Sequence, residues 1–186
     1  MRWSRNIILL LTMAALPISS LNARVTLTFL SRDFGVYFPH AFIEVSGATD
    51  AAPQKPVLAN YGFTARALTP GILLGRVQGE IESMDDGYVR GSRRHFSIEL
   101  DDAEYYRLMT LIDQWRSIPG KSYDLHHRNC VSFVKAVAES VGLSANHADA
   151  LLLKPRSFLD DVAAENAGHI NAGSLPMGSP LTMAAR

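Results

Sequence analysis

Apolar and polar residues alternate with a period of two through much of the chain between residues 25 and 100, and this pattern predicts β-strands. Clusters of Gly, Pro, Asp and Asn separate these segments, as is typical of turns. One cluster, residues 84–87, ends in an Asp-Gly pair, which favours a tight hairpin turn. The predicted strands cover residues 25–30, 37–45, 57–64, 75–83, 88–90 and 95–100.

The period changes after residue 100, where apolar residues begin to recur every three to four positions and predict helices. Asp101 and Glu104 have the spacing of a capping box. Gly142 is typical of a residue just beyond a helix end, and Pro155 suits a first helical turn. Helices are therefore expected over residues 102–117, from a start at or beside Cys130 to about 142, and over 155–166.

The two ends of the chain have a different composition. Two arginines precede an apolar run over residues 7–16, which is typical of an export signal. That run is about half the ~20 residues needed to cross a bilayer, so we expect residues 1–23 to be a signal peptide cleaved after Ala23. Leu21 fits the cleavage site poorly, so an inner-membrane anchor is the alternative. Residues 167–186 are rich in Gly, Ser, Pro and Ala and are predicted to form a flexible tail.

Composition narrows the class of protein. The hydrophobic and charged fractions, 47% and 19%, suit a soluble globular fold, and residues 24–166 are long enough for one domain. Eighteen basic residues balance eighteen acidic ones, so no overall field attracts nucleic acid, and nucleic-acid binding is disfavoured. We expect a protein of the periplasm or one that is secreted, with inner-membrane anchoring as the alternative.

Cys130 is the single cysteine, so the chain cannot form an internal disulfide. A leftover thiol in an exported protein suggests chemistry or a partner chain. At the start of a helix the unpaired N–H groups stabilise a thiolate, and with a histidine nearby a free-thiol pKa of about 8.5 falls to ~3.5–7.5. The alternative is a buried structural cysteine, since Cys130 shares an apolar helix side with Val134 and Val137. His40, which opens an apolar strand, is the obvious general base.

Three short motifs carry a resemblance to a known group: His-Ala-Phe-Ile-Glu-Val at His40, Val-Leu-Ala-Asn ending at Asn60, and Asn-Cys-Val-Ser-Phe-Val at Cys130. In this order the chain resembles the circularly permuted papain-like cysteine hydrolases over roughly residues 40–141. That superfamily includes NlpC-type cell-wall endopeptidases in unpermuted order and the lecithin-retinol acyltransferase group, permuted like this chain. The resemblance implies an α+β, papain-like fold whose antiparallel sheet packs against a helix bearing the cysteine at its N-terminus.

The resemblance also implies a catalytic triad, in which Cys130 is the nucleophile, His40 the base and later the acid, and a polar residue holds the imidazole ring. Asn60 is the expected third member, although acyltransferase relatives carry a histidine at the matching place. Glu44 is its rival, because alternation along the strand puts it on the same face as His40.

The expected activity is that of an exported thiol hydrolase that cleaves amide bonds, with cell-wall peptides as the substrate that the compartment favours. The alternatives are a lipid acyl hydrolase or acyltransferase of the same fold, and a non-catalytic exported binding domain. The expected partner is a peptide, amide or lipid substrate, and membrane contact is expected only if the leader is retained or the substrate is a lipid. No cofactor or metal is expected, because the adjacent His126 and His127 point apart and the acidic residues of 80–86 lack the spacing of a calcium loop.

Overall fold

A computed structural model of the protein describes residues 24–33, 38–51, 55–67 and 69–173, with the side chains of 171–173 outside the description. Its strands form one five-stranded antiparallel sheet in the order β4-β3-β2-β1-β5. The α+β class expected from the sequence is confirmed. The strands are β1 (Val25–Arg32), β2 (His40–Ala48), β3 (Pro56–Ala65), β4 (Gly79–Glu82) and β5 (Arg93–Leu100).

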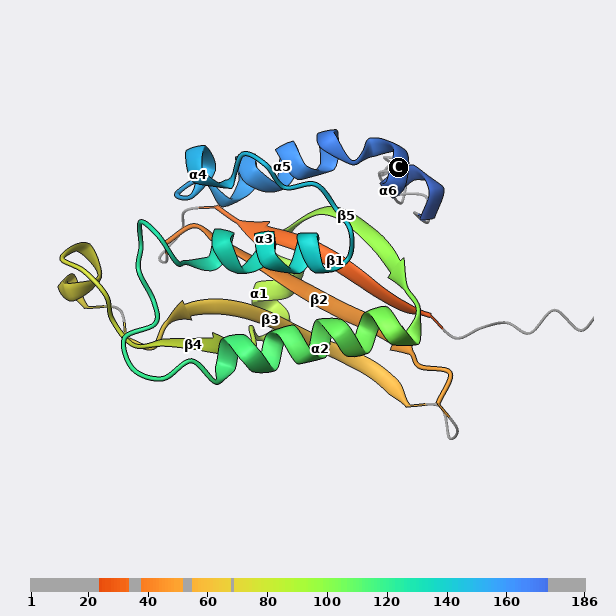
Figure 1. Ribbon diagram of the computed structural model, residues 1–186, viewed down its shortest axis with the longest axis horizontal. Helices are drawn as coiled ribbons and strands as arrows, with labels where there is room; N and C mark the ends of the chain where they lie inside the picture. Colours follow the sequence, from red (N-terminus) through yellow and green to blue (C-terminus); the bar gives the residue numbers. More distant parts are fainter. Residues whose placement is uncertain (1–23, 34–37, 52–54, 68, 174–186) are drawn as a thin grey trace, which may run out of the picture.

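Helices cover the sheet unequally (Figure 1). Helices α2 (Asp102–Arg116), α3 (Cys130–Ser140) and α5 (Pro155–Glu165) lie on one face, and the single-turn α1 (Asp86–Arg90) lies on the other. The remaining helical segments are short. They are η1 (Pro70–Leu73), α4 (Ala148–Leu151) and α6 (Ala167–Gly173).

The main core lies between the sheet and the larger helices. Alternate strand residues such as Phe29, Ile43 and Phe63 are fully buried there, as are Phe133 and Val134 of α3. Burial of each such side chain contributes about 1.5–3 kcal/mol. The intervening residues of the same strands face α1, where Leu30, Phe42 and Val89 form a smaller cluster. Even-numbered residues of β2 therefore face α1, and odd-numbered ones face α3.

The predicted helices form where the capping signals place them. At the start of α2, the N–H of Glu104 donates to Asp101 Oδ1 over 2.8 Å, and the N–H of Asp101 donates to Glu104 Oε2 over 3.0 Å, so the capping box is confirmed. Helix α5 begins at Pro155 as expected. Gly142 follows α3 with a φ of +80°, a left-handed conformation that glycine adopts without strain.

The hairpin predicted around residues 84–87 is wrong. Asp85 instead caps α1, its side chain accepting the N–H of Tyr88 over 2.9 Å, so the Asp-Gly pair forms the first turn of a helix. Residues 88–90 are consequently helical rather than a strand. The acidic residues before them are divided between β4 and the start of α1, and they do not form a hairpin loop.

The first part of the predicted tail is helical. Helix α6 occupies residues 167–173, and Ile170 is buried against the core. The rest of the predicted tail and the predicted leader, residues 1–23, lie outside the described residues, as does Tyr37 at the start of a predicted strand. Among the helices that the structure describes, none combines the length and the apolar character needed to cross a bilayer.

Candidate functional site

The start of α3 is fixed by Asn129, which is 2% exposed. Its side-chain oxygen accepts the N–H groups of Val131 and Ser132, at 2.8 and 3.3 Å, and Ser132 Oγ accepts the N–H of Asn129 in return. The Asn129 amide group donates to two carbonyls outside the helix, those of Leu125 and Leu152, over 2.8 Å each. This cap places Cys130 in the first turn of α3. The Asn-x-x-Ser spacing is the sequence signal that predicts it.

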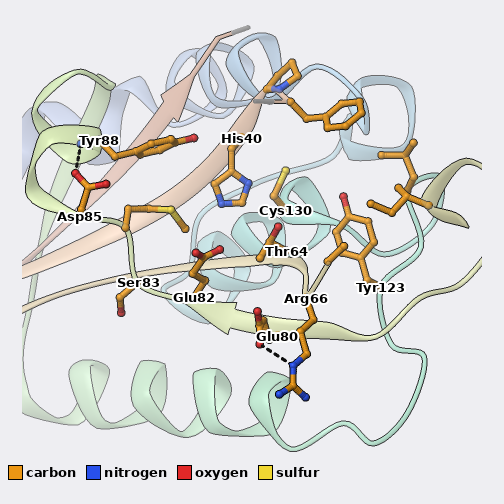
Figure 2. A pocket seen from close by; sticks show the side chains of 16 residues that line it. His40, Thr64, Arg66, Glu80, Glu82, Ser83, Asp85, Tyr88, Tyr123 and Cys130 are labelled. Carbon is orange, nitrogen blue, oxygen red and sulfur yellow. Dashed lines mark hydrogen bonds and ion pairs between the residues drawn. The ribbon is translucent and has the colours of Figure 1, made fainter. Parts of the chain in front are cut away.

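His40 is the first residue of β2 and lies beside Cys130 (Figure 2). Both line one cavity with a volume of about 540 Å³. Its lining includes Tyr88 of α1 and Cys130 of α3, which come from opposite sides of the sheet, so the cavity wraps around the beginning of β2. The structure thus brings together the two residues that the sequence analysis named as nucleophile and base.

Burial keeps both groups neutral in this arrangement. It raises the pKa of the Cys130 thiol to about 11, although backbone N–H groups of Ala41, Val131 and Cys130 itself act in the opposite direction. It lowers the pKa of His40 to about 4. The sequence-based expectation of a lowered thiol pKa is therefore wrong for the resting protein, because desolvation of the sulfur outweighs the N–H groups at the helix N-terminus.

The outer nitrogen of the His40 ring, Nε2, is buried and has no hydrogen-bond partner. It faces Gly62 of β3, where a Cβ atom would lie only 2.4 Å from it. The other ring nitrogen, Nδ1, faces Cys130 in Figure 2. The ring also stacks on Phe42, with 6.1 Å between the centroids. The imidazole is thus held by packing, with Nδ1 as the nitrogen available to the thiol.

Asn60 does not reach His40. In the β2–β3 register it pairs with Glu44, four residues beyond His40, which corresponds to roughly 13 Å along a strand. Its amide is occupied by Met84, donating to the Met84 carbonyl over 3.0 Å and accepting the Met84 N–H over 2.6 Å. The structure therefore does not support Asn60 as the third member of the site, and it gives Asn60 the role of tying β3 to the segment before α1.

Glu44, the rival third residue, is on the same face of β2 as His40 but is also engaged elsewhere. Its carboxylate accepts a hydrogen bond from Arg94 of β5 over 2.6 Å. A strand is too straight to return that carboxylate to a side chain four residues away. The structure does not bring Glu44 into contact with His40.

Tyr123 lines the cavity and was given no role by the sequence analysis. Its backbone pairs with Val77, which fixes the segment between α2 and α3 against the chain before β4. Burial is the main cause that raises the pKa of its hydroxyl, and the nearby Cys130 and Asp124 raise this pKa further. The hydroxyl is therefore a neutral donor close to the sulfur, a position that only the folded chain reveals.

A second set of residues has the connectivity of a serine hydrolase triad. Ser31 Oγ lies 2.7 Å from His95 Nε2, and His95 Nδ1 lies 2.8 Å from Asp160 Oδ1. Ser31 is 1% exposed and is not among the residues that line the described cavity. These hydrogen bonds join β1, β5 and α5, and we assign them a structural role.

Two histidine clusters lie outside the cavity lining. Asp124 accepts the N–H of His126 and lies 3.1 Å from His127 Nδ1, so these residues stabilise a turn. His147, Asp161 and Glu165 place one ligand atom each within 4.8 Å of one another, the one such group in the part of the chain that the structure describes. These three side chains already form ion pairs at the surface, at 2.8 and 3.2 Å.

The site is thus defined by its own geometry: a buried thiol at a helix N-terminus, an imidazole at a strand start and a phenol beside them. Comparison of the chain with family models, with curated proteins and with solved structures found no match.

Proposed function

We propose that the protein is a thiol hydrolase that cleaves amide bonds, with Cys130 as nucleophile and His40 as general base. The observation that carries the proposal is the meeting of these two side chains over a shared cavity, with Cys130 in the first turn of α3. A reactive thiol needs a base within reach and N–H groups at the place where negative charge develops. In this proposal His40, distant in the sequence, supplies the base, and the start of α3 supplies the N–H group.

The proposed reaction starts from the neutral pair. As the sulfur attacks the amide carbonyl, the thiol proton moves to His40 Nδ1 and the carbonyl electron pair moves to its oxygen. The Cys130 N–H takes no part in the Asn129 cap, and with the Tyr123 hydroxyl it can donate to that oxyanion. Collapse breaks the carbon–nitrogen bond while His40 gives its proton to the leaving amine. Water then attacks the acyl carbon while His40 takes its proton, the carbon–sulfur bond breaks, and His40 returns the proton to the sulfur, which releases the acid and restores the thiol.

We also propose that the fold is papain-like in permuted order and that the protein is exported. The antiparallel sheet, the histidine on a strand and the later cysteine on a helix support the fold. The compartment rests on the sequence of residues 1–23, which favours the periplasm and hence amides of the cell wall.

Trapping the acyl-enzyme tests the proposal. The protein from residue 24 onward is incubated with cell-wall peptides and with an activated acyl amide, and mass spectrometry follows both product and protein mass. We expect an acyl adduct on Cys130 and released product, both lost in Cys130→Ala and in His40→Ala. A parent protein that forms neither adduct nor product with any amide or lipid ester would overturn the proposal and support a non-catalytic binding domain.

A lipid acyl hydrolase or acyltransferase is the second candidate, favoured by two exposed leucines. Leu73 and Leu74 are 64% and 88% exposed, and they follow Ile72, which lines the cavity. Leucines beside an active-site entrance can insert into a lipid surface. Release of fatty acid from phospholipid vesicles, reduced at least tenfold in Leu74→Ser while hydrolysis of a soluble ester is unchanged, would favour this function over peptide cleavage.

A further inference from the structure

The buried Nε2 atom of His40 lacks a hydrogen-bond partner, and such an atom in a native protein calls for an explanation. In a Cys–His site the outer ring nitrogen normally donates to a group that fixes the tautomer. Asn60 and Glu44 do not fill this role, because their side chains are held by Met84 and Arg94. The neighbouring strand β4 also contributes side chains to the cavity lining.

The β3–β4 register identifies a carboxylate at this place. Gly62 pairs directly with Glu82, so the two residues face the same side of the sheet. Gly62 also lies against His40 Nε2, as the 2.4 Å approach of an added Cβ shows. Because Gly62 has no side chain, β3 itself places nothing between the imidazole of β2 and the carboxylate of β4, and the Met84 methyl group is the other side-chain tip beside this place, 3.1 Å from the position of an added Cβ. Figure 2 shows the His40 ring between the Cys130 thiol and the Glu82 side chain.

We propose that Glu82 is the positioning residue of the site, and that its carboxylate accepts a hydrogen bond from His40 Nε2 across the gap left by Gly62. The inference rests on the proposed thiol hydrolase function. Directly paired residues on neighbouring strands have Cβ atoms roughly 5 Å apart, a distance that the three bonds from Cβ to a carboxylate oxygen of glutamate can span. In the structure the Glu82 side chain is exposed at the cavity rim, so rotation of this side chain closes the contact.

Glu82 is free to make this contact. Within the part of the chain that the structure describes, no ion pair or hydrogen bond to its carboxylate is found, whereas Glu80 on the same strand pairs with Arg66. The charged group opposite His40 in the β1–β2 register, Arg32, is directed to the Tyr88 carbonyl, 3.0 Å from its Nη1. The contact is open around the neutral imidazole, and we expect it to close whenever His40 is protonated, with or without substrate.

The contact would have two chemical effects. It fixes the proton on Nε2, which leaves the lone pair of Nδ1 facing Cys130, as base catalysis requires. It also places a negative charge beside the imidazolium that forms when the thiol proton is transferred. Glu82 would therefore act through His40 without touching the substrate's reacting atoms.

The experiment compares Glu82→Ala and Glu82→Gln with Asp86→Asn, a control that removes the same charge from an exposed residue outside the cavity lining. We expect Glu82→Ala to lower kcat by about 100-fold, at the low end for acid–base catalysis, with KM nearly unchanged. Glu82→Gln should retain more activity, because its amide oxygen still accepts from Nε2. The acid limb of the kcat/KM profile should shift to lower pH in both variants, and Asp86→Asn should match the parent.

A second readout does not depend on turnover. An NMR titration of His40 should give a pKa about one unit or more higher in the parent than in Glu82→Ala, because a nearby carboxylate favours the imidazolium by 1–3 units. Equal His40 titration, or equal kcat in Glu82→Ala and Asp86→Asn, overturns the inference while leaving the hydrolase proposal intact. If the parent proves inactive toward every substrate but the titration differs as expected, the proposed function fails and the Glu82 contact stands.

Discussion

Replacement of Asn129 by alanine should destabilise the protein and disturb the position of Cys130. The substitution removes an N-cap, worth about 1 kcal/mol, and two hydrogen bonds to the carbonyls of Leu125 and Leu152, worth about 1 kcal/mol each, so we expect a loss of about 3 kcal/mol. The segment before α3 and the loop before α5 would both lose their attachment to the helix start.

A serine at this position separates the two contributions. Asn129→Ser keeps a side-chain oxygen for the Val131 N–H but cannot reach both carbonyls, so the expected loss is about 2 kcal/mol. Asn146→Ala is the matched control, because Asn146 is exposed and, among the described residues, bonds only to the surface side chains of Ser144 and Glu165. It should change stability by less than about 0.5 kcal/mol.

Urea unfolding at pH 7, followed by circular dichroism and by tryptophan fluorescence, measures these differences, provided that the m-value is unchanged. If the proposed function holds, initial rates of acyl-adduct formation report the position of the Cys130 thiol in the same samples. The reasoning is refuted if Asn129→Ala lies within about 1 kcal/mol of the parent, or if the serine and alanine variants are equally unstable, since the two carbonyl contacts and the cap would then not be separate contributions.

Four further outcomes are expected. Gly62→Ala should lower the free energy of unfolding by about 1–3 kcal/mol and remove most activity, because its Cβ would lie 2.4 Å from His40 Nε2. Gly168→Ala is the control: Gly168 has open space around it, so the same urea assay should show a neutral or slightly stabilising effect. Since burial raises the pKa of Cys130 to about 11, its alkylation by iodoacetamide should still rise between pH 8 and pH 10, and a plateau near pH 7 would show a resting thiolate. Tyr123→Phe should lower kcat by about tenfold, with normal folding, if the phenol donates to the oxyanion, and an unchanged kcat would remove it from the mechanism. Ser31→Ala should lower the free energy of unfolding by about 1–3 kcal/mol, because it leaves His95 Nε2 buried without its partner. The hydrolytic rate should be unchanged, and a loss of acyl transfer would instead identify Ser31 as a nucleophile.

The sequence was sufficient for the features that depend on local patterns. Period-two alternation located the main strands, and the Asp101 capping box located α2, because these signals come from neighbouring residues. The same local reasoning failed at residues 84–87, where an Asp-Gly pair suits both a hairpin turn and the capped first turn of a helix. The choice depends on Asn60, which holds the backbone of Met84 from another strand.

The site was predicted only where each residue carries its own chemical signature. A single cysteine beside a helix start and a histidine at a strand start are visible in the sequence, and the structure brings them together. The surroundings of His40 depend instead on the register between β2, β3 and β4, which no local pattern reveals. That register keeps Asn60 away from the imidazole and brings Gly62 beside it.

The order of the elements along the chain has a consequence for folding. All five strands lie between residues 25 and 100, and the helices that cover the main core follow them. A growing chain can therefore pair its strands while one face of the sheet is still bare and apolar, and such a face attracts chaperones or other chains. Because Cys130 arrives on the helix that closes this face, its thiol meets His40 only when α3 docks. Acyl-adduct formation would then serve as a probe of completed folding.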